Sequence, residues 1–425
     1  METIHALATG RGRAGVAVIR VSGPSAWAIA DRMAAPLPAP REAGLRTIRD
    51  GAGTALDRGL VLPFAEGASF TGEPVVEFHV HGGPAVVEAV LRSLGELGLS
   101  RMAVAGEFTR RALENGVLDL TQVQGLADLI DAETEEQRRT ALRVADGAWS
   151  EMLSGWRAAL VRARALLEAT IDFADEDVPQ DVLPEVRDLL VGVRDGIGAQ
   201  IAGAARARAV REGVVVAVIG PPNAGKSSLI NRLTSRDVAI VSDRAGTTRD
   251  VIEARIELDG ILVTLLDTAG LRTTADEVEG LGIDRAKARA RDADLRLFLR
   301  LADEAPDPDL FRADRDLVLR GKADLGGGDV SAVTGVGVDR IVEWIGKHVE
   351  DGGVGDSFVS RERDRIMLEE AASAIEAAID QAGADEAELV AEDIRRATTA
   401  LERILGRVDV EEVLGEIFSS FCLGK

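Results

Sequence analysis

The sequence predicts a multidomain protein that combines α/β domains with an all-α domain. Its 425 residues exceed what one ordinary core needs, so about two to four domains are expected. Residues 1–117 and 212–350 alternate short β-like apolar runs with helix-like stretches, which is typical of α/β domains. Residues 118–211 and 351–425 are rich in Ala, Leu, Arg and Glu, with apolar residues three and four apart, as in helical bundles. We therefore expect an α/β module inserted between the two halves of one helical domain.

Composition excludes several classes of protein. Hydrophobic residues make up 46% and charged residues 29% of the chain, which is the balance of a soluble globular protein. The single cysteine, Cys422, cannot form an internal disulfide, and charges interrupt every apolar run well before the roughly 18 residues of a membrane span. A cytoplasmic protein without a membrane segment is expected. The formal net charge of −22 repels nucleic-acid backbones, so RNA would have to bind through a local basic patch or a partner subunit.

The N-terminal α/β domain is predicted from two strand-like runs and one helix. The strands are expected at 16–21 and 74–80, the helix is expected near 84–98, and turn residues separate them. On the second strand Glu77, His79 and His81 alternate, so they share one face. Hydrogen bonding is expected more than a metal site, because no further His or Cys lies nearby.

A phosphate-binding loop is predicted where a buried strand, Val214–Ile219, meets a helix. Residues 220–227 match G-x-x-x-x-G-K-[ST] in that strand-to-helix context. In such a loop backbone N–H groups surround the phosphates, Lys226 binds the β- and γ-phosphate oxygens, and Ser227 is a ligand of Mg²⁺. The predicted nucleotide contacts here are Asn223, Ala224, Gly225, Lys226, Ser227 and Ser228.

Two further segments follow in the order that a GTPase requires. Thr248, in Gly-Thr-Thr-Arg-Asp, supplies a switch hydroxyl for Mg²⁺ and the γ-phosphate. Strand-like runs on either side of an Asp-Gly turn then lead to Asp267, a second Mg²⁺ ligand, and to Gly270, whose N–H faces the γ-phosphate. This order predicts a Ras-like G domain over 212–350, with Lys226, Thr248 and Gly270 acting in catalysis. The predicted nucleotide contacts of these segments are Thr247, Thr248, Asp267, Thr268, Ala269 and Gly270.

Recognition of guanine is predicted to be unorthodox. Lys322 and Asp324 match the end of an Asn/Thr-Lys-x-Asp signature, but Gly321 stands where Asn is usual. Asp324 can accept two hydrogen bonds from guanine, whereas Gly321 has no side chain to connect this loop to the phosphate loop. Weaker nucleotide affinity with guanine preference largely kept is therefore expected. Ser331 and Ala332 resemble the last guanine-contacting loop, and the segment between 300 and 329 is short.

The group that orients the attacking water is not where Ras-like enzymes have it. The usual Gln position is Leu271, which cannot form a hydrogen bond. The next carboxylates are Asp276, Glu277 and Glu279. From the residues alone, each is more typical of a solvated surface group than of a catalytic one.

These motifs resemble the MnmE family of tRNA modification GTPases, also called TrmE, over nearly the whole chain. The resemblance extends to 12–15, 69–73, 81–83, 106–109 and the ending Phe-Ser-Ser-Phe-Cys-Leu-Gly-Lys at 418–425. It implies an N-terminal folate-binding domain that dimerises (1–117), a helical domain (118–211 and 351–425) and a G domain inserted into it (212–350).

The resemblance also implies roles for individual residues. Two G domains would dimerise across a K⁺ ion that replaces an arginine finger, and Glu279 would position the hydrolytic water. The K⁺ site would be formed by Asn223, Ser242, Arg244 and Thr247. A 5-formyl-tetrahydrofolate or related folate would be bound by Arg20, Glu77, Lys425 and position 117, where Val117 replaces the Lys common in the family. Cys422 would serve the modification reaction.

The implied function is GTP hydrolysis in tRNA modification. Such a homodimer works with the FAD-dependent protein MnmG (GidA) to add a carboxymethylaminomethyl-type group to C5 of the wobble uridine, and tRNA binds largely through the complex. Two alternatives stay open. One is a ribosome-assembly or regulatory GTPase switch, and the other is a nucleotide-binding scaffold that has lost turnover, for which Gly321 is the only indication.

Overall fold

The computed structural model describes residues 2–172, 182–235, 253–267, 288–301, 305–350, 357–381, 387–408 and 424. The chain forms two compact units. The first consists of Met1–Ala127, Ala145–Ser150 and Glu402–Lys425, and the second of Asp128–Val144 and Glu151–Leu401. The first unit is therefore assembled from segments that are far apart in the sequence.

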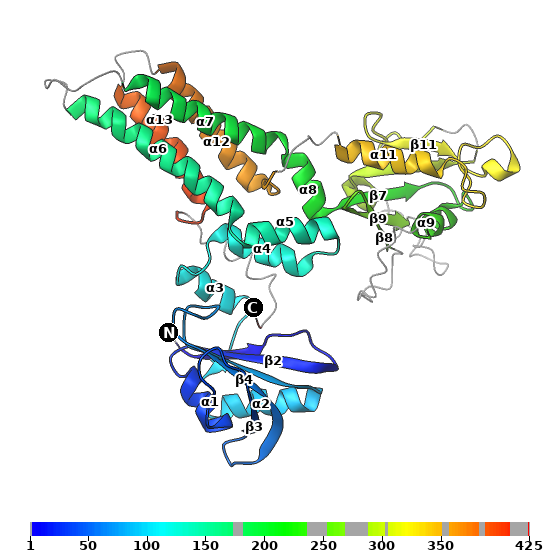
Figure 1. The fold of residues 1–425 in the computed structure, drawn as a ribbon. Coiled ribbons are helices and arrows are strands. Elements are labelled where there is room, and N and C mark those ends of the chain that lie inside the picture. The colour runs from blue at the N-terminus through cyan, green and yellow to red at the C-terminus, as the bar shows by residue number, and fades with distance from the viewer. Residues whose placement is uncertain are drawn as a thin grey trace. The chain divides into compact units, whose positions relative to one another are not determined.

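The first unit is built on a six-stranded sheet (Figure 1). Its strands lie in the order β3-β4-β5-β2-β1-β6, and all neighbours are antiparallel except β1 and β6. The strands are β1 (Ile4–Leu7), β2 (Ala14–Ser22), β3 (Gly44–Arg49), β4 (Ala55–Phe64), β5 (Val75–Gly82) and β6 (Arg101–Met102). The strands expected at 16–21 and 74–80 are confirmed as β2 and β5.

Two helices cover one face of this sheet. Helices α1 (Ala26–Ala34) and α2 (Pro84–Glu96) bury Ile29, Met33 and Leu94 against apolar strand residues such as Ile19 and Phe78. Because side chains alternate along a strand, the neighbouring positions Arg20, Glu77 and His79 lie on the opposite face. The helix expected near 84–98 is confirmed as α2.

A network of buried charges connects the sheet to helix α3 (Glu107–Glu114). The Arg111 guanidinium, whose side chain is 5% exposed, donates to Glu73 at 3.0 Å and to Glu107 at 3.1 Å. Glu107 also accepts from Arg101 at 2.6 Å, and Ser22 donates to Glu73 at 2.7 Å. The sequence motifs at 69–73 and 106–109 thus have a structural role, since they supply the carboxylates of this network.

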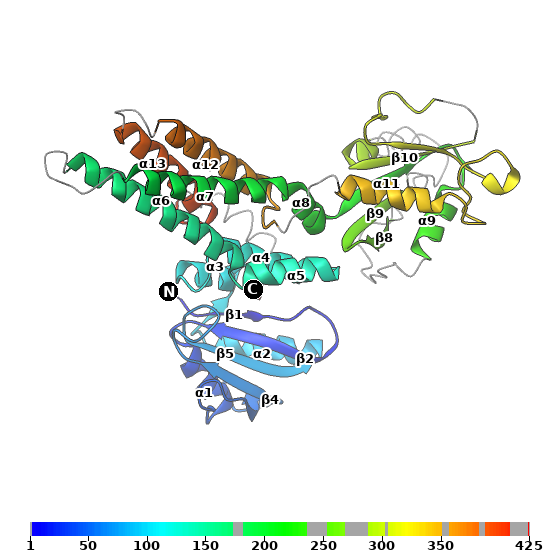
Figure 2. The ribbon, with the colours of Figure 1, turned by 45° about the horizontal axis from the view of Figure 1, so that its top comes forward.

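The second unit contains a bundle of long helices. Four of them lie side by side in both views (Figures 1 and 2). These are α6 (Ala148–Asp172), α7 (Leu183–Ala202), α12 (Glu362–Gln381) and α13 (Ala387–Ile404). The shorter helices of the helical domain are α4 (Leu120–Asp131), α5 (Glu135–Ala145) and α8 (Ala204–Glu212). Apolar positions with helical spacing, including Leu190 and Ile197 on α7 and Leu368 and Ile375 on α12, are fully buried.

The chain leaves the helical bundle after α8 and returns to it next to α7. Ser357 donates to the carbonyl of Gln200 at 2.8 Å, and the N–H of Phe358 donates to the side-chain oxygen of Gln200 at 2.8 Å. Arg211, near the end of α8, also donates to the carbonyl of Ser360 at 3.3 Å, so the two connections of the inserted α/β module lie close together.

The inserted module is a P-loop G domain with a five-stranded sheet in the described part of the chain. The strands lie in the order β11-β10-β7-β9-β8, all parallel except β8. They are β7 (Val214–Ile219), β8 (Glu253–Leu258), β9 (Ile261–Asp267), β10 (Leu295–Arg300) and β11 (Leu317–Arg320). The other elements are α9 (Lys226–Thr234), the 3₁₀ turn η1 (Ala323–Leu325) and α11 (Val338–Glu350).

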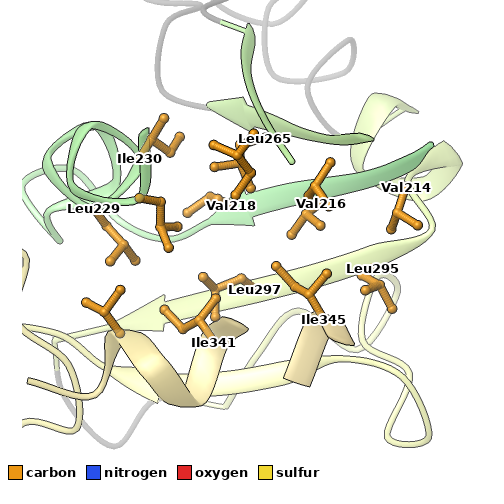
Figure 3. Close-up of a cluster of buried hydrophobic side chains, with 14 of the residues drawn as sticks. Val214, Val216, Val218, Leu229, Ile230, Leu265, Leu295, Leu297, Ile341 and Ile345 are labelled. Carbon is orange, nitrogen blue, oxygen red and sulfur yellow. The ribbon is translucent and has the colours of Figure 1, made fainter. Parts of the chain in front are cut away.

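Strand β7 is buried on both faces. Figure 3 shows Val216 and Val218 facing a cluster that includes Leu297 of β10 and Ile341 of α11. Ala217 points to the other face of the sheet and packs in a second cluster. Burial on two sides explains the uninterrupted apolar run of this strand, which is typical of parallel sheets.

The charge network of the first unit generates a prediction about acid stability. Burial alone would raise the pKa of Glu107, but hydrogen bonds from Arg101, the N–H of Val104 and Arg111 outweigh it and lower the pKa from 4.5 to about 2. The stabilisation is fully present above pH 4.5 and is lost as the pH falls through 2. Glu107→Gln should therefore lower the free energy of unfolding by about 3 kcal/mol at pH 7, and by progressively less toward pH 2.

Thermal unfolding between pH 2 and 7 checks this prediction, with exposed Glu114→Gln on the same helix as control. A constant difference between Glu107→Gln and the parent protein across that range would contradict it.

Candidate functional site

The phosphate loop connects the carboxyl end of β7 to helix α9. Gly225 adopts the left-handed region at φ 97° and precedes the first helical residue, Lys226. The buried Lys226 ammonium donates to the carbonyls of Gly220 at 2.7 Å and Pro221 at 3.0 Å. The cation is thus held inside the loop, where backbone N–H groups at a helix start favour phosphate.

Two oxygen ligands for a divalent cation meet beside this loop. The Ser227 hydroxyl donates to Asp267 Oδ2 at 2.5 Å. Asp267 is the last residue of β9, is 1% exposed and lies opposite Val218 of β7. A hydroxyl and a carboxylate are the oxygen donors that Mg²⁺ prefers, so this pair fits the Mg²⁺ role predicted for it. Ser228 is exposed on the next position of α9.

The structure brings the two parts of the predicted base-recognition site together. Asp324, in η1, accepts a hydrogen bond from the buried Ser331 hydroxyl at 2.6 Å. Lys322, just before η1, is exposed and adopts a left-handed conformation at φ 60°. Ala332 follows Ser331 and is half-buried. The hydroxyl therefore orients the carboxylate that would face the N–H groups of guanine.

Gly321 lies directly against the phosphate loop. A Cβ atom placed on Gly321 would be 2.8 Å from the carbonyl oxygen of Ala224 and 3.4 Å from Leu299. The N–H of Gly321 donates to the carbonyl of Arg300 at 2.8 Å. The sequence suggested a base loop without a connection to the phosphate loop, but the missing side chain allows a direct backbone approach.

The same loop is closed by its own backbone. The N–H groups of Asp329 and Val330 donate to the carbonyl of Arg320 at 2.7 and 3.0 Å. A Cβ atom on Gly328 would be 2.5 Å from the carbonyl oxygen of Gly321. Close backbone packing thus holds Asp324 and Ser331 in place within a segment too short for further elements.

A second cluster of polar side chains lies on the face of the N-terminal sheet opposite α1 and α2. Arg20 of β2 and Glu77 of β5 are cross-strand partners, with Arg20 Nε donating to Glu77 Oε1 at 3.0 Å. His79 Nε2 lies 3.2 Å from the other oxygen of Glu77. The guanidinium carbon of Arg20 is 5.1 Å from the centre of the Phe70 ring and 5.6 Å from that of Phe108. Two aromatic rings therefore support the cation, which sequence reasoning did not foresee.

Two further positions of the first unit concern the predicted folate site: Val117 itself, and Gly424, the residue before Lys425. Val117 is 41% exposed, and a Cβ atom on Gly72 would be 3.0 Å from its side chain. Gly424 is buried, and a Cβ atom there would be 2.0 Å from the carbonyl oxygen of Leu7. The C-terminal motif thus has one described residue against the end of β1.

Several predicted site residues lie outside the described residues. Asn223 is exposed in the phosphate loop at φ 60°, but its proposed partners around K⁺ are not among the described residues. The residues outside the described ranges are Ser242, Arg244, Thr247, Thr248, Thr268, Ala269, Gly270, Glu279, Cys422 and Lys425. Their predicted roles stay predictions.

Comparison with known proteins identifies close relatives along the whole chain. A family model described as the GTP-binding protein TrmE N-terminus matches residues 3–117, and one described as the MnmE helical domain matches residues 120–422. Proteins named tRNA modification GTPase MnmE from Cereibacter sphaeroides and Roseobacter denitrificans are 53% and 50% identical, with 100% of each chain covered. The corresponding protein of Caulobacter vibrioides is 48% identical over 100% of both chains.

Two solved structures that resemble the chain each match part of it. An Aquifex aeolicus Era variant bound to GDP and AlF4⁻ is 23% identical with a TM-score of 0.25, covering 37% of this chain and 66% of that chain. The G domain of the T. maritima FeoB iron transporter is 22% identical with a TM-score of 0.24, covering 32% of this chain and 99% of that chain.

The contact between Gly321 and Ala224 generates a prediction about nucleotide affinity. Gly321→Ala should raise the Kd for GDP about fivefold or more, because overpacking against the Ala224 carbonyl costs about 1–3 kcal/mol and displaces the phosphate loop. Gly321→Asn should act in the same direction rather than tighten binding, since it also adds a Cβ atom.

Titration with a fluorescent GDP analogue measures the effect. Gly346→Ala in α11 is the matched control, because the nearest atom to its Cβ would be 4.0 Å away. Tighter binding by Gly321→Asn would show instead that the usual Asn side chain can be accommodated and restores the connection.

Proposed function

Because the chain belongs to the MnmE family of tRNA modification GTPases, we propose that it uses GTP hydrolysis to drive C5 modification of the tRNA wobble uridine. The GTPase activity and its place in tRNA modification follow from the family relationship. The proposal adds the carboxymethylaminomethyl-type group and an FAD-dependent partner of the MnmG type. It assigns folate binding and dimerisation to residues 1–117, GTP hydrolysis to 212–350, and the connection between them to 118–211 and 351–425.

The phosphate loop carries the GTPase part of this proposal. Lys226 is buried inside the loop, so its charge would offset the charge that develops on the β- and γ-phosphate oxygens. Ser227 and Asp267 are already within hydrogen-bond distance and would hold Mg²⁺, which supplies further charge compensation when bound. Asp324, oriented by Ser331, would select guanine.

In this proposal, two G domains dimerise, and the dimer activates the attacking water and binds K⁺ as a second cation. Leu271 cannot orient water, so Glu279 takes that role. Asn223 supports a K⁺ site because its exposed position leaves the side-chain oxygen accessible to a cation. The further ligands proposed for K⁺ are Ser242, Arg244 and Thr247, while Thr248 and Gly270 face the γ-phosphate.

The face that carries Arg20 and Glu77 supports a folate site. A guanidinium suits the carboxylates of a folate tail, and a carboxylate suits the amino and N–H donors of its ring system. Both groups are only partly exposed, at 17% and 15%, and are held by each other and by Phe70. Lys425 and Cys422 would act near this face in folate binding and modification. Val117 offers no charge, so any cation needed there comes from another residue.

The surface charge of the chain supports tRNA binding through the complex rather than through this chain alone. The net charge is −22, and arginines of several exposed helix faces pair with acidic neighbours, as Arg138 does with Glu135 and Arg164 with Glu168.

None of the helices in the described part of the chain combines the length and apolar character that a membrane span requires. We place the homodimer and its partner in the cytoplasm.

Potassium dependence tests the catalytic part of the proposal. Steady-state GTP hydrolysis should be about tenfold or more faster in K⁺ than in Na⁺ at equal ionic strength, because a fixed cation offsets transition-state charge. Asn223→Ala should abolish this difference while nucleotide Kd stays within about twofold. Equal slow rates in both salts would remove the K⁺ site and favour a regulatory switch or a scaffold.

Ligand titration tests the folate part. Glu77→Gln, which conserves volume, should raise the Kd of 5-formyl-tetrahydrofolate about tenfold, since charge-assisted hydrogen bonds contribute about 1.5–3 kcal/mol. The exposed Glu88→Gln on α2, behind the sheet, is the matched control. Identical Kd values for the two variants would rule out Glu77 as a folate ligand.

A further inference from the structure

The two strands that end at the phosphate site begin at the same place. Strands β7 and β9 are parallel neighbours, from Val214 opposite Val263 to Val218 opposite Asp267. Their carboxyl ends lead to the phosphate loop and to Asp267. Their amino ends therefore lie together at the opposite edge of the sheet, about 20 Å away at the usual rise per residue.

The N-terminal cap of α5, defined here as Glu133, Thr134 and Gln137, is a rigid structure. Thr134 and Gln137 form a capping box, in which the N–H of Gln137 donates to Thr134 Oγ1 at 3.1 Å and Gln137 Oε1 accepts from the N–H of Thr134 at 3.0 Å. The same Gln137 oxygen accepts from the N–H of Glu133 at 2.8 Å. Thr134 is 4% exposed. This hydrogen bonding fixes the side chains of Thr134 and Gln137 and the backbone of Glu133.

This cap contacts the turn before β9 and the end of helix α8, which precedes β7. The Thr134 hydroxyl donates to the carbonyl of Gly260, in the turn immediately before β9, at 2.9 Å. The Gln137 amide donates to the carbonyl of Arg211, three residues before β7, at 3.2 Å. One helix cap therefore connects the helical domain to the turn before β9, and it also holds the end of α8, from which the chain enters β7.

The hairpin of β8 and β9 is held at two further points. Arg255 of β8 forms an ion pair with Glu133 at 2.5 Å, and both side chains are partly buried, at 33% and 21% exposed. Its turn residues Asp259 and Gly260 have φ angles of 49° and 82°, as a tight two-residue hairpin turn requires. A Cβ atom on Gly260 would lie 2.9 Å from Cβ of Glu136, so the turn packs closely on the first turn of α5.

We propose that the α5 cap positions the phosphate loop and Asp267 for GTP hydrolysis and so couples the helical domain to the nucleotide site. Because β7 is held by packing on both faces, a displacement of the β8–β9 hairpin relative to β7 changes the spacing between Ser227 and Asp267. Glu133, Thr134, Gln137 and Arg255 are positioning residues, because none of them contacts the phosphate loop.

Charge reversal in the full-length chain tests this inference. Glu133→Arg and Arg255→Glu should each lower kcat for GTP about fivefold or more, the usual lower range of coupling between sites, while Kd for GDP stays within about twofold. The double variant should recover at least half of the lost kcat, because the pair is restored with opposite polarity. Glu135→Arg is the matched control, since Glu135 pairs with Arg138 and Arg139 of its own helix.

A second pair of variants tests the hydroxyl. Thr134→Val removes the hydrogen bond to Gly260 and should lower kcat, whereas Thr134→Ser keeps it and should not. Unchanged kcat in the charge-reversed single variants would overturn the inference. Failure of the double variant to recover activity, or a parallel fall of kcat, nucleotide affinity and Tm in every variant, would also overturn it, because the contact would then be structural only.

Discussion

Burial of β7 on both faces is the constraint on which the nucleotide site depends. Apolar side chains on the two sides of this strand pack in separate clusters, so the strand can neither slide nor rotate without exposing one of them. Its neighbours β9 and β10 are held in register by parallel hydrogen bonding. The phosphate loop therefore begins at a fixed point, and Asp267 reaches Ser227 because β9 ends where β7 does. The polar chemistry of the site is positioned by hydrophobic packing several residues away.

The insertion of the G domain reuses the helical domain as a support. The returning connection is anchored at Gln200, which accepts one hydrogen bond with its side chain and one with its backbone. The α5 cap adds contacts with the end of α8, where the chain leaves the bundle, and with the β8–β9 hairpin. An inserted domain held at these points has less orientational freedom than one joined by a flexible linker. A structural change at its nucleotide site can therefore displace the helices that contact it.

Local features of the sequence predicted the elements whose causes are local. The apolar run of β7, the glycines of the phosphate loop and the Asp-Gly turn between β8 and β9 each act on neighbouring residues. Strands β1, β3 and β4 were not predicted, because β1 has only four residues and charged residues interrupt the apolar runs of β3 and β4. The Arg111 network and the Arg20 contacts with two aromatic rings also depend on residues far apart in the chain. Gly321 shows the limit most clearly: the sequence reveals the missing side chain, but only the fold places Ala224 against it.

The position of Gly424 has a consequence for the order in which the molecule can be completed during synthesis. The first unit includes residues from both ends of the chain, and Gly424 lies directly against the backbone of Leu7 and Ala8. A ribosome makes β1 first and the C-terminal segment last, after the whole helical domain and G domain have emerged. The contact of Gly424 with Leu7 and Ala8 can therefore form only after nearly the entire chain has been translated. A prematurely terminated chain would retain the phosphate loop yet lack the segment that closes the N-terminal unit.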